Sequence, residues 1–585
     1  MERARNELLD LIDSVVGKKS LVLEKPISGV LSLLIPLPAL QEHGIQRIYT
    51  IEKNLPENID EKIVYICRPS FDIAQIVSGH IHQAQRLALR RSYTVITLPK
   101  SNILFDSILQ EQGVFGEIDL LKWNFSTVVL DDDLLSMELS PNEEPTQMLS
   151  MAVDAVFEFE KEHGLFPRLC GRGPLVDQFC LLREKRLQEE SSTTDRSETA
   201  FLFSQDIDSL LIFDRSMDMV TPLMTQLTFE GLLDEAFGIN QMFVKLPPNL
   251  ITDTAESGLV GKKFSLHTHA NPLFKELRDL SILNIGPQLG RIGRKLSDTY
   301  NERKDAKTVG EIKSFVSRLG ALRTEHSSLN IFTSLAEALV QQTKRPSFQD
   351  FLQLQQSLAS GLDANSQLTL LDSLISRMAP AEDVLRMLCL ASVVSDGLRA
   401  KDIDVYRREI TQTYGYEHLI TLHRLMETPL LQIRTTSGLP FQKSSLYQQW
   451  LRTYPIIVEN VNEQQPDDIA YTYGGYGPLS VHILRDILEH RDAPDAVTRL
   501  TSLPGKYVDY RSEQPLNHKN TLPTANPSPK TVVILFLGGC TYAELSALRF
   551  LQEKLSLNFV FITTGIINGS SYMGSFVPKS MFPTA

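Results

Sequence analysis

The sequence predicts an α/β plus all-α protein, in which a large helical domain is inserted into the second of two parallel-sheet α/β domains. Its 585 residues are too many for one hydrophobic core. Short β-branched runs alternate with helical stretches near both ends of the chain, which is typical of parallel sheets. From about residue 240 to residue 461 the pattern is almost entirely helical. The simplest arrangement is that the last α/β piece completes the second sheet.

The first 130 residues or so form the first α/β region. The strands expected there are Leu21–Leu23, Gln46–Ile51, Lys62–Cys67, Tyr93–Leu98 and Thr127–Leu130, and the helices are Phe71–Ala88 and Ile103–Gln112. Three aspartates, Asp131 to Asp133, directly follow the last of these strands. They could mark a metal site, but a solvated strand end explains them better.

A second α/β region begins near Glu144. Apolar residues at helical spacing predict a helix over Met148–His163, and the apolar run in Ser209–Asp214 predicts a buried strand. The run Glu184–Ser197 is polar and charged, so it is interpreted as a loop.

The C-terminal part returns to the α/β style. A strand is expected at Val532–Gly539, a helix at Tyr542–Leu555 and a strand at Phe559–Thr563. Before them, Glu513–Lys530 contains four prolines and few apolar residues, as expected of a linker or surface loop.

The middle region has the periodicity of amphipathic helices. Thr308 and Glu311 have the spacing of a capping box, which marks a helix start. Apolar residues then recur at spacings of three and four, namely Val309, Ile312, Val316, Leu319, Leu329, Phe332, Leu335 and Leu339. Further helices are expected at Leu368–Met378, Ala381–Val394 and Asp402–Tyr414.

The bulk composition is typical of a globular protein of a reducing cytosol. A net charge of −13 disfavours a broad nucleic-acid surface, because such a chain repels phosphate backbones. The five cysteines form no CxxC pair, so buried free thiols are expected rather than disulfides. The longest apolar stretch, Gly29–Leu40, is too short to span a bilayer, and no signal or lipidation motif is recognised. Direct membrane insertion is therefore not expected.

The sequence offers few candidates for catalysis. Gly538 and Gly539 follow a strand and open a helix, where α/β sheets bind phosphates, but neither GxxxxGK[ST] nor GxGxxG is present. A structural turn is therefore favoured over a nucleotide-binding enzyme site. Residues 171–174 are interpreted as a loop, and the pair His267 and His269 is a weak zinc candidate that could offer two ligands from a strand. No catalytic residue, cofactor or metal is predicted.

The segment Leu210–Gly238 is different in kind. A buried strand ends in Asp214 and Arg215, and Asp218 and Pro222 follow. In an active site Asp214 and Asp218 could act as paired carboxylates. In a structural turn, the charges of Asp214 and Arg215 would cap the next helix and the neighbouring strands. The structural interpretation is favoured.

This segment resembles the signature of the SM (Sec/Munc) family of SNARE regulators, a strand followed by D-R-x-x-D-x-x-T-P and a helix beginning near L-T-[YF]-E-G. Thr531–Leu551 resembles the closing strand, Gly-Gly turn and helix of the same family. Three further stretches are similar to the vacuolar and lysosomal branch of that family, namely Lys307–Leu319, Tyr406–Leu425 and Asp467–Val481. The resemblance implies a non-enzymatic, three-domain arch. Domain 1 would span residues 1–140, domain 2 residues 141–240 and 466–585, and the helical domain 3 residues 241–465.

The resemblance also implies that a hairpin at about 291–343 binds Qa- and R-type SNARE motifs and templates or protects their assembly for vesicle docking and fusion. The candidate binding residues are mostly basic, namely Arg291, Arg294, Lys295, Arg303, Lys304, Lys307, Lys313 and Val316. Where related proteins carry a His-Thr pair, this chain has Phe332-Thr333.

A second surface is expected at Arg407, Tyr416 and Leu419. In the vacuolar branch the corresponding stretch meets the subunit called vacuolar protein sorting sixteen, and through it the HOPS and CORVET tethering complexes. An aromatic residue beside an apolar and a basic one has the composition of an interface hot spot. The implied location is the cytoplasmic side of late endosomes and of the lysosome or vacuole, reached through partners. A purely structural subunit of a tethering complex is the remaining alternative.

Overall fold

The computed structural model describes residues 2–56, 59–98, 102–193, 202–247, 263–305, 309–361, 364–434, 446–489, 506–511 and 530–578. Within these ranges the side chains of residues 2, 191–193, 299–305, 309–321 and 364–368 are not described. The chain divides into two compact units, residues 1–129 and 130–585, and each is described by itself. The three-domain boundaries at residues 140, 240 and 465 stay a prediction.

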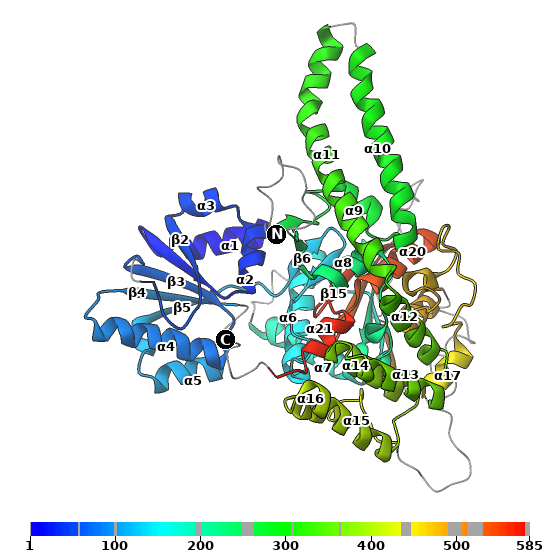
Figure 1. Ribbon diagram of the computed structural model, residues 1–585. Helices are drawn as coiled ribbons and strands as arrows, with labels where there is room; N and C mark the ends of the chain where they lie inside the picture. The colour runs from blue at the N-terminus through cyan, green and yellow to red at the C-terminus, as the bar shows by residue number, and fades with distance from the viewer. Residues whose placement is uncertain are drawn as a thin grey trace, which may run out of the picture. The chain divides into compact units, whose positions relative to one another are not determined.

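The first unit is a five-stranded parallel sheet with helices on both faces (Figure 1). The strand order is β2-β1-β3-β4-β5, with β1 Lys19–Leu23, β2 Ile45–Thr50, β3 Lys62–Cys67, β4 Ser92–Thr97 and β5 Ile118–Lys122. The helices are α1 Glu2–Asp13, α2 Ile27–Leu34, α3 Leu37–Glu42, α4 Phe71–Arg86 and α5 Ile103–Glu111. The central strand β3 is buried along most of its length because helices cover both sides, as is typical of parallel sheets.

The second unit contains a seven-stranded sheet in the order β13-β8-β9-β14-β15-β7-β6. The strands are β6 Val128–Asp131, β7 Leu134–Ser136, β8 Arg168–Arg172, β9 Ile207–Asp214, β13 Tyr507–Arg511, β14 Thr531–Leu537 and β15 Asn558–Thr563. Strand β14 lies in the middle and pairs in parallel with β9 and β15. The prediction that the C-terminal α/β piece completes the second sheet is therefore confirmed. The strand expected at Thr127–Leu130 joins this sheet as its edge and not the first one.

Helices cover this sheet and make up most of the chain between β9 and β14. Those associated with the sheet are α6 Pro145–His163, α7 Pro174–Thr193, α8 Phe229–Phe237, α18 Leu479–Glu489, α20 Tyr542–Leu555 and α21 Gly569–Gly574. The helical region contains α9 Pro272–Leu277, α10 Ile282–Asp305, α11 Val309–Thr343, α12 Pro346–Ala359, α13 Ala364–Ser376, α14 Ala381–Val394, α15 Ala400–Tyr414, α16 His418–Met426 and α17 Leu446–Thr453. Helices α10 and α11 lie side by side as a hairpin that extends away from the other helices of the unit (Figure 1).

The helical region is less uniform than the sequence pattern indicated. It starts with a small antiparallel sheet of β10 Ile239–Asn240, β11 Phe243–Lys245 and β12 Lys263–Ser265. The turn between the first two strands is made by Gln241 and Met242, which both have positive φ (51° and 60°). Two successive positive-φ residues are typical of a two-residue hairpin turn. Such turns are usually recognised in a sequence by glycine or asparagine, so the pair Gln241 and Met242 gives no sign of this one.

Two loop interpretations are wrong. The polar run from Glu184 continues helix α7 to Thr193, because its side chains make ion pairs with α6, among them Lys161–Glu190 at 3.0 Å. Residues 171 and 172 belong to strand β8, and only Gly173 has the positive φ of a turn. Thr308 of the expected capping box and all of the expected linker Glu513–Lys530 except Lys530 lie outside the described residues.

Candidate functional site

The turn after β9 uses its charged residues for internal contacts. The Asp214 carboxylate accepts hydrogen bonds from the backbone N–H groups of Ser216 and Leu175, both at 2.9 Å, and so holds the start of α7. A Cβ atom on Gly173 would lie 2.2 Å from the Asp214 Cβ, so this approach requires glycine. These contacts are the ones expected of a structural turn.

Arg215 connects this turn to helix α20. Its guanidinium is buried and lies 2.7 Å from Glu544 Oε2, and it also donates to the carbonyl oxygens of Gly539 (3.2 Å) and Asp218 (3.0 Å). Burial lowers the pKa of Arg215, but the attraction of Glu544 and Asp218 is larger and raises it above its ordinary value. The guanidinium therefore stays charged and fixed.

The Asp218 carboxylate is also engaged in internal hydrogen bonds. Its carboxylate accepts from the backbone N–H groups of Thr221 and Ser480, both at 3.0 Å, and from the Thr221 hydroxyl at 2.5 Å. Burial raises the pKa of Asp218. The next residue of the signature, Pro222, is buried in a short 3₁₀ turn, Thr221–Leu223. Asp214 and Asp218 both accept hydrogen bonds from backbone N–H groups and so cap the turns that follow them.

The turn of Gly538 and Gly539 is structural as well. Both residues have φ of +92°, and a Cβ on Gly538 would lie 2.8 Å from the Arg215 Cβ. Helix α20 then begins with a capping box, in which Thr541 accepts from the N–H of Glu544 and Glu544 accepts from the N–H of Thr541. The Glu544 carboxylate occupies the helix N-terminus, where a phosphate would otherwise bind.

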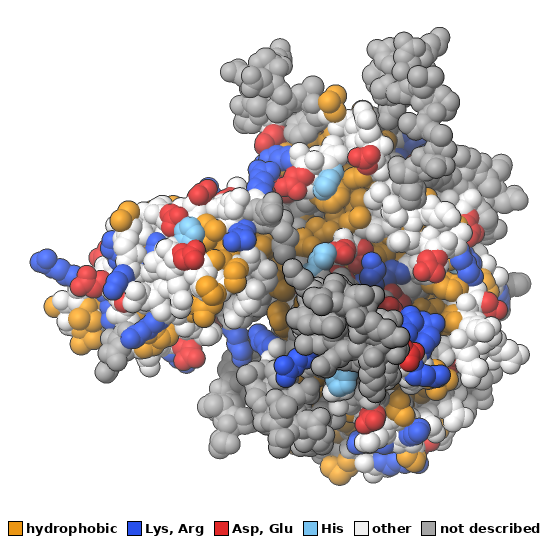
Figure 2. All heavy atoms as spheres, turned by 90° about the horizontal axis from the view of Figure 1, so that it is seen from above, with side chains coloured by type: hydrophobic (Ala, Val, Ile, Leu, Met, Phe, Trp, Pro, Cys, Tyr) orange, Lys and Arg blue, Asp and Glu red, His pale blue; other side chains and the backbone are white. Residues whose placement is uncertain are grey.

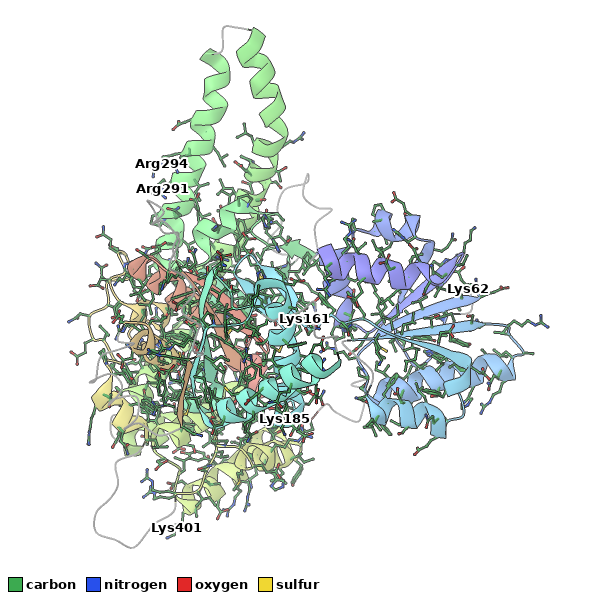
Figure 3. All side chains as sticks on the ribbon, turned by 180° about the vertical axis from the view of Figure 1, so that it is seen from behind. Lys62, Lys161, Lys185, Arg291, Arg294 and Lys401 are labelled. Carbon is green, nitrogen blue, oxygen red and sulfur yellow. The ribbon has the colours of Figure 1, made fainter. Side chains whose placement is uncertain are left out.

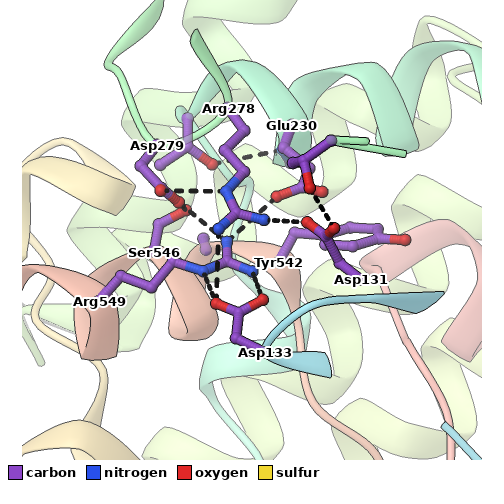
Figure 4. A network of polar contacts seen from close by, with 12 residues as sticks. Asp131, Asp133, Glu230, Arg278, Asp279, Tyr542, Ser546 and Arg549 are labelled. Atoms are coloured by element: carbon purple, nitrogen blue, oxygen red, sulfur yellow. Dashed lines mark hydrogen bonds and ion pairs between the residues drawn. The ribbon is translucent and has the colours of Figure 1, made fainter. Parts of the chain in front are cut away.

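Six charged residues form a network where the hairpin joins the sheet (Figure 4). We call it the root network; it consists of Asp131, Asp133, Glu230, Arg278, Asp279 and Arg549. Arg278 pairs with Asp131, and Arg549 lies 2.7 Å from Asp133 and 3.0 Å from Asp279. The solvated strand end expected at Asp131–Asp133 is therefore wrong for Asp131 and Asp133, because arginines far away in the sequence fold over them. Only Asp132 is exposed, and its carboxylate contacts His269 at 2.7 Å.

Aromatic side chains fill the space next to the root network. Phe332 of α11 is fully buried, and its ring centroid lies 5.4 Å from Phe264, 5.8 Å from Phe274 and 6.3 Å from Phe229. Thr333 donates to the Leu329 carbonyl oxygen within α11. Phe332 is therefore a packing residue at the base of the hairpin. The neighbouring Leu329, Leu335 and Leu339 are also buried, as the apolar stripe predicted.

The expected basic residues on the first hairpin helix lie on its surface. Ile292 and Leu296 of α10 are buried, whereas Arg291 and Arg294 lie on the side that faces away from α11 (Figure 3). Lys295 is also exposed. The side chains of Arg303, Lys304, Lys313 and Val316 are not described, and Lys307 lies outside the described residues.

The expected partner surface is exposed at the junction of α15 and α16. The Tyr416 side chain is 81% exposed, and Leu419 and Ile420 beside it are exposed too. Arg407 on α15 is exposed and pairs with Asp404 at 2.9 Å. Helices α15 and α16 pack together. Ile420 was not among the residues selected from the sequence.

The other chemical candidates do not form sites among the residues that the structure describes. His267 and His269 lie in the turn after β12 and not on a strand, with their rings stacked 5.3 Å apart. No group of three or more His, Cys, Asp or Glu in the described ranges could hold a metal ion. Four of the five free thiols are buried, and burial raises the pKa of Cys389 and of Cys540 to about 12. Lys and Arg side chains are interspersed with Asp and Glu on the face drawn in Figure 2.

None of the described helices has the length and apolar content required to cross a membrane. The polar turns at the ends of β9 and β14 serve the internal architecture, and the helical region between them presents a long hairpin. Fold and site together define an α/β protein whose second sheet carries a large inserted helical region. The chain belongs to the Sec1 family, whose model matches residues 19–575.

The relatives match over nearly the whole chain. Vacuolar protein sorting-associated protein 33 of Schizosaccharomyces pombe is 49% identical over 582 residues, covering 99% of this chain and 98% of that protein. Vacuolar protein sorting-associated protein 33A of Rattus norvegicus is 32% identical over 596 residues, covering 99% and 97%.

Solved structures share the fold. The SM protein Vps45 in complex with the Qa SNARE Tlg2 aligns with a TM-score of 0.58 at 16% identity, covering 98% of this chain and 97% of that one. The Unc18–syntaxin 1 complex from Monosiga brevicollis aligns with a TM-score of 0.57 at 12% identity, covering 98% of both chains. These matches confirm the expected SM-protein fold.

Proposed function

We propose that this chain binds SNARE motifs along the hairpin of α10 and α11 and holds two of them side by side as they become helices. The observation that carries the proposal is the hairpin itself, a pair of long helices with Arg291 and Arg294 on an exposed side. Two solved structures of the same fold contain the SM protein Vps45 in complex with the Qa SNARE Tlg2 and Unc18 in complex with syntaxin 1. The role is one of binding, without catalysis.

The physical benefit is a lower cost of assembly. SNARE motifs are disordered alone, and starting a helix is unfavourable, so each motif loses conformational entropy before it gains contacts. A hairpin that binds two motifs in register raises the effective concentration of each for the other, to about the millimolar range for short separations. The exposed arginines would select the acidic positions of a motif and speed its association.

We also propose that Tyr416, Leu419, Ile420 and Arg407 bind a subunit of the vacuolar protein sorting sixteen type. An exposed tyrosine flanked by aliphatic side chains is the composition found at the centre of protein interfaces. Through that partner the chain would join HOPS- or CORVET-like tethering complexes on late endosomes and on the lysosome or vacuole. The names of the relatives, which refer to vacuolar protein sorting, support this location.

The test is a binding titration with a fluorescent vacuolar-type Qa SNARE motif at near-physiological salt. Reversing both charges with Arg291→Glu and Arg294→Glu should weaken binding at least about tenfold, since charges that meet a complementary surface contribute to affinity and association rate. Lys185→Glu is the matched control, because Lys185 is an exposed lysine of α7, far from the hairpin in the same unit (Figure 3). Equal affinity in all three proteins would contradict the proposed site, and a full-length chain that binds only its partner subunit would favour a purely structural role.

A further inference from the structure

The root network has more negative than positive groups. Two guanidinium groups, of Arg278 and Arg549, face the four carboxylates of Asp131, Asp133, Glu230 and Asp279 (Figure 4). With every group ionised the cluster has a formal charge of −2. A surplus of buried charge is unfavourable, because the low-dielectric interior stabilises ions only when they are paired.

Glu230 is the carboxylate with the weakest ionic contacts. Its side chain is only 1% exposed, and its ion-pair contact is with Arg549 Nη1 at 3.4 Å. By comparison, Asp133 lies 2.7 Å from Arg549, and Asp279 accepts from the Ser546 hydroxyl at 2.7 Å as well as from Arg549. Both of those carboxylates are also more exposed than Glu230.

Titratable and charged groups surround Glu230 from several elements of the fold. Helix α20 contributes Arg549 and Tyr542, the link between α9 and α10 contributes Arg278 and Asp279, the end of β6 and the turn after it contribute Asp131 and Asp133, and its own helix carries Asp234 and Glu235. Burial raises the pKa of Glu230 to about 7, the attraction of the two arginines opposes this rise, and the negative charges of Asp279 and Asp131 add to it.

Phe229 and Glu230, at the start of α8, contact the base of the hairpin on both sides. Its backbone N–H donates to the Arg278 carbonyl oxygen at 3.1 Å, and the N–H of Phe229 donates to the Leu280 carbonyl oxygen at 2.9 Å. Helix α10 begins two residues after Leu280. The Phe229 ring in turn packs against Phe332 of α11. The start of α8 therefore clamps the base of α10 on one side and the base of α11 on the other.

We propose that Glu230 is a proton-operated latch for the hairpin root. Neutral Glu230 removes one surplus charge from the root network and keeps the base of the hairpin closed, whereas ionised Glu230 repels Asp131 and Asp279 and lets that base open more often. The latch is a property of the folded chain, and only its effect on SNARE binding rests on the proposed function.

The pH dependence follows from the direction of the pKa shift. An acid whose pKa is raised in the folded state binds its proton more tightly there than in the opened state, so stability falls as the pH rises from the ordinary value of 4.5 to the folded value of about 7. If opening restores the ordinary pKa, the equilibrium constant for opening should increase about tenfold between pH 6 and pH 8.

The test is hydrogen–deuterium exchange of the full chain at pH 6 and pH 8, corrected for the intrinsic exchange rate and read at residues 278–285. The wild type should lose about tenfold in protection over this interval. In Glu230→Gln the side chain at position 230 stays neutral, so its ionisation cannot reduce the protection between pH 6 and pH 8. This variant should also be better protected than the wild type at pH 8. Glu337→Gln, an exposed carboxamide control on α11, should behave like the wild type.

A different pattern overturns the latch. If Glu230 is ionised and stably paired throughout, Glu230→Gln lowers the protection equally at both pH values, and the wild type shows no excess pH dependence. Should Glu230→Gln fail to fold, Asp279→Asn serves instead, because it removes one neighbouring negative charge. This variant should lower the pKa of Glu230 in the folded state, so its protection should fall less than that of the wild type between pH 6 and pH 8 and be higher at pH 8. An unchanged transition in Asp279→Asn also contradicts the proposal. Because this readout needs no SNARE, it can fail while the proposed function stands.

Discussion

Replacing Arg215 by alanine should destabilise the second unit strongly. The guanidinium is 4% exposed and donates to Glu544 and to the carbonyl oxygens of Gly539 and Asp218. Its removal leaves the Glu544 carboxylate buried, with the Ser480 hydroxyl and its own helix start as the remaining donors. Breaking a buried ion pair from one side costs about 3–5 kcal/mol, so the free energy of unfolding should fall by about that amount.

Urea denaturation followed by far-ultraviolet circular dichroism measures this loss. Arg377→Ala provides the comparison, because Arg377 forms an exposed ion pair with Asp350 and its loss should change the free energy of unfolding by less than about 1 kcal/mol. Combining Arg215→Met with Glu544→Gln should recover part of the stability, since no charge is then left unpaired. A loss below about 1 kcal/mol for Arg215→Ala, matching the exposed control, would refute the assignment of this turn as a structural connection.

Three further outcomes are expected. Phe332→Ala should cost about 3–5 kcal/mol of unfolding free energy, whereas Phe332→Leu should cost less, as read by urea denaturation, because the phenyl ring fills the base of the hairpin. Burial lowers the pKa of His482 to about 3, so the wild type should lose stability relative to His482→Gln as the pH falls from 6.5 towards 3, and parallel pH profiles of the two proteins would contradict this. Tyr416→Asp should abolish capture of the partner subunit in a pull-down without changing the melting temperature. Tyr510→Asp, a control at another exposed tyrosine, should retain capture. Equal capture by both variants would show that Tyr416 is not part of the interface.

The central strands β3 and β14 were predictable from the sequence, whereas the edge strands β5 and β13 were not. Strands β3 and β14 are covered on both faces, so each appears as a continuous apolar run. Strand β5 is only partly buried and β13 is mostly exposed, so neither carries a distinctive pattern. Periodicity likewise identified α14 and α20 with the observed bounds. The second half of helix α7 was not predicted, because it has no apolar stripe. Ion pairs with α6 stabilise it instead.

The candidate sites divide in the same way. The signature around Asp214 and Arg215 was recognisable because its own residues lie close together in the sequence, although Glu544, the partner of Arg215, lies 329 residues away. The root network could not be recognised in the sequence, because Asp133 and Arg549 are 416 residues apart and neither residue alone indicates an ion pair. A cluster of buried charges made by tertiary folding has no local sequence signal; the run of aspartates was the one visible part of it.

The position of strand β14 has a consequence for how the protein is made. Its neighbour β9 ends at Asp214, but β14 begins only at Thr531, after the entire helical region. During synthesis β9 therefore leaves the ribosome long before β14, which pairs with its edge. Unpaired strand edges are prone to aggregation. The nascent chain should depend on chaperones over this interval. A premature stop codon before Thr531 should yield a product that is degraded, even though the sequence of the hairpin would be complete.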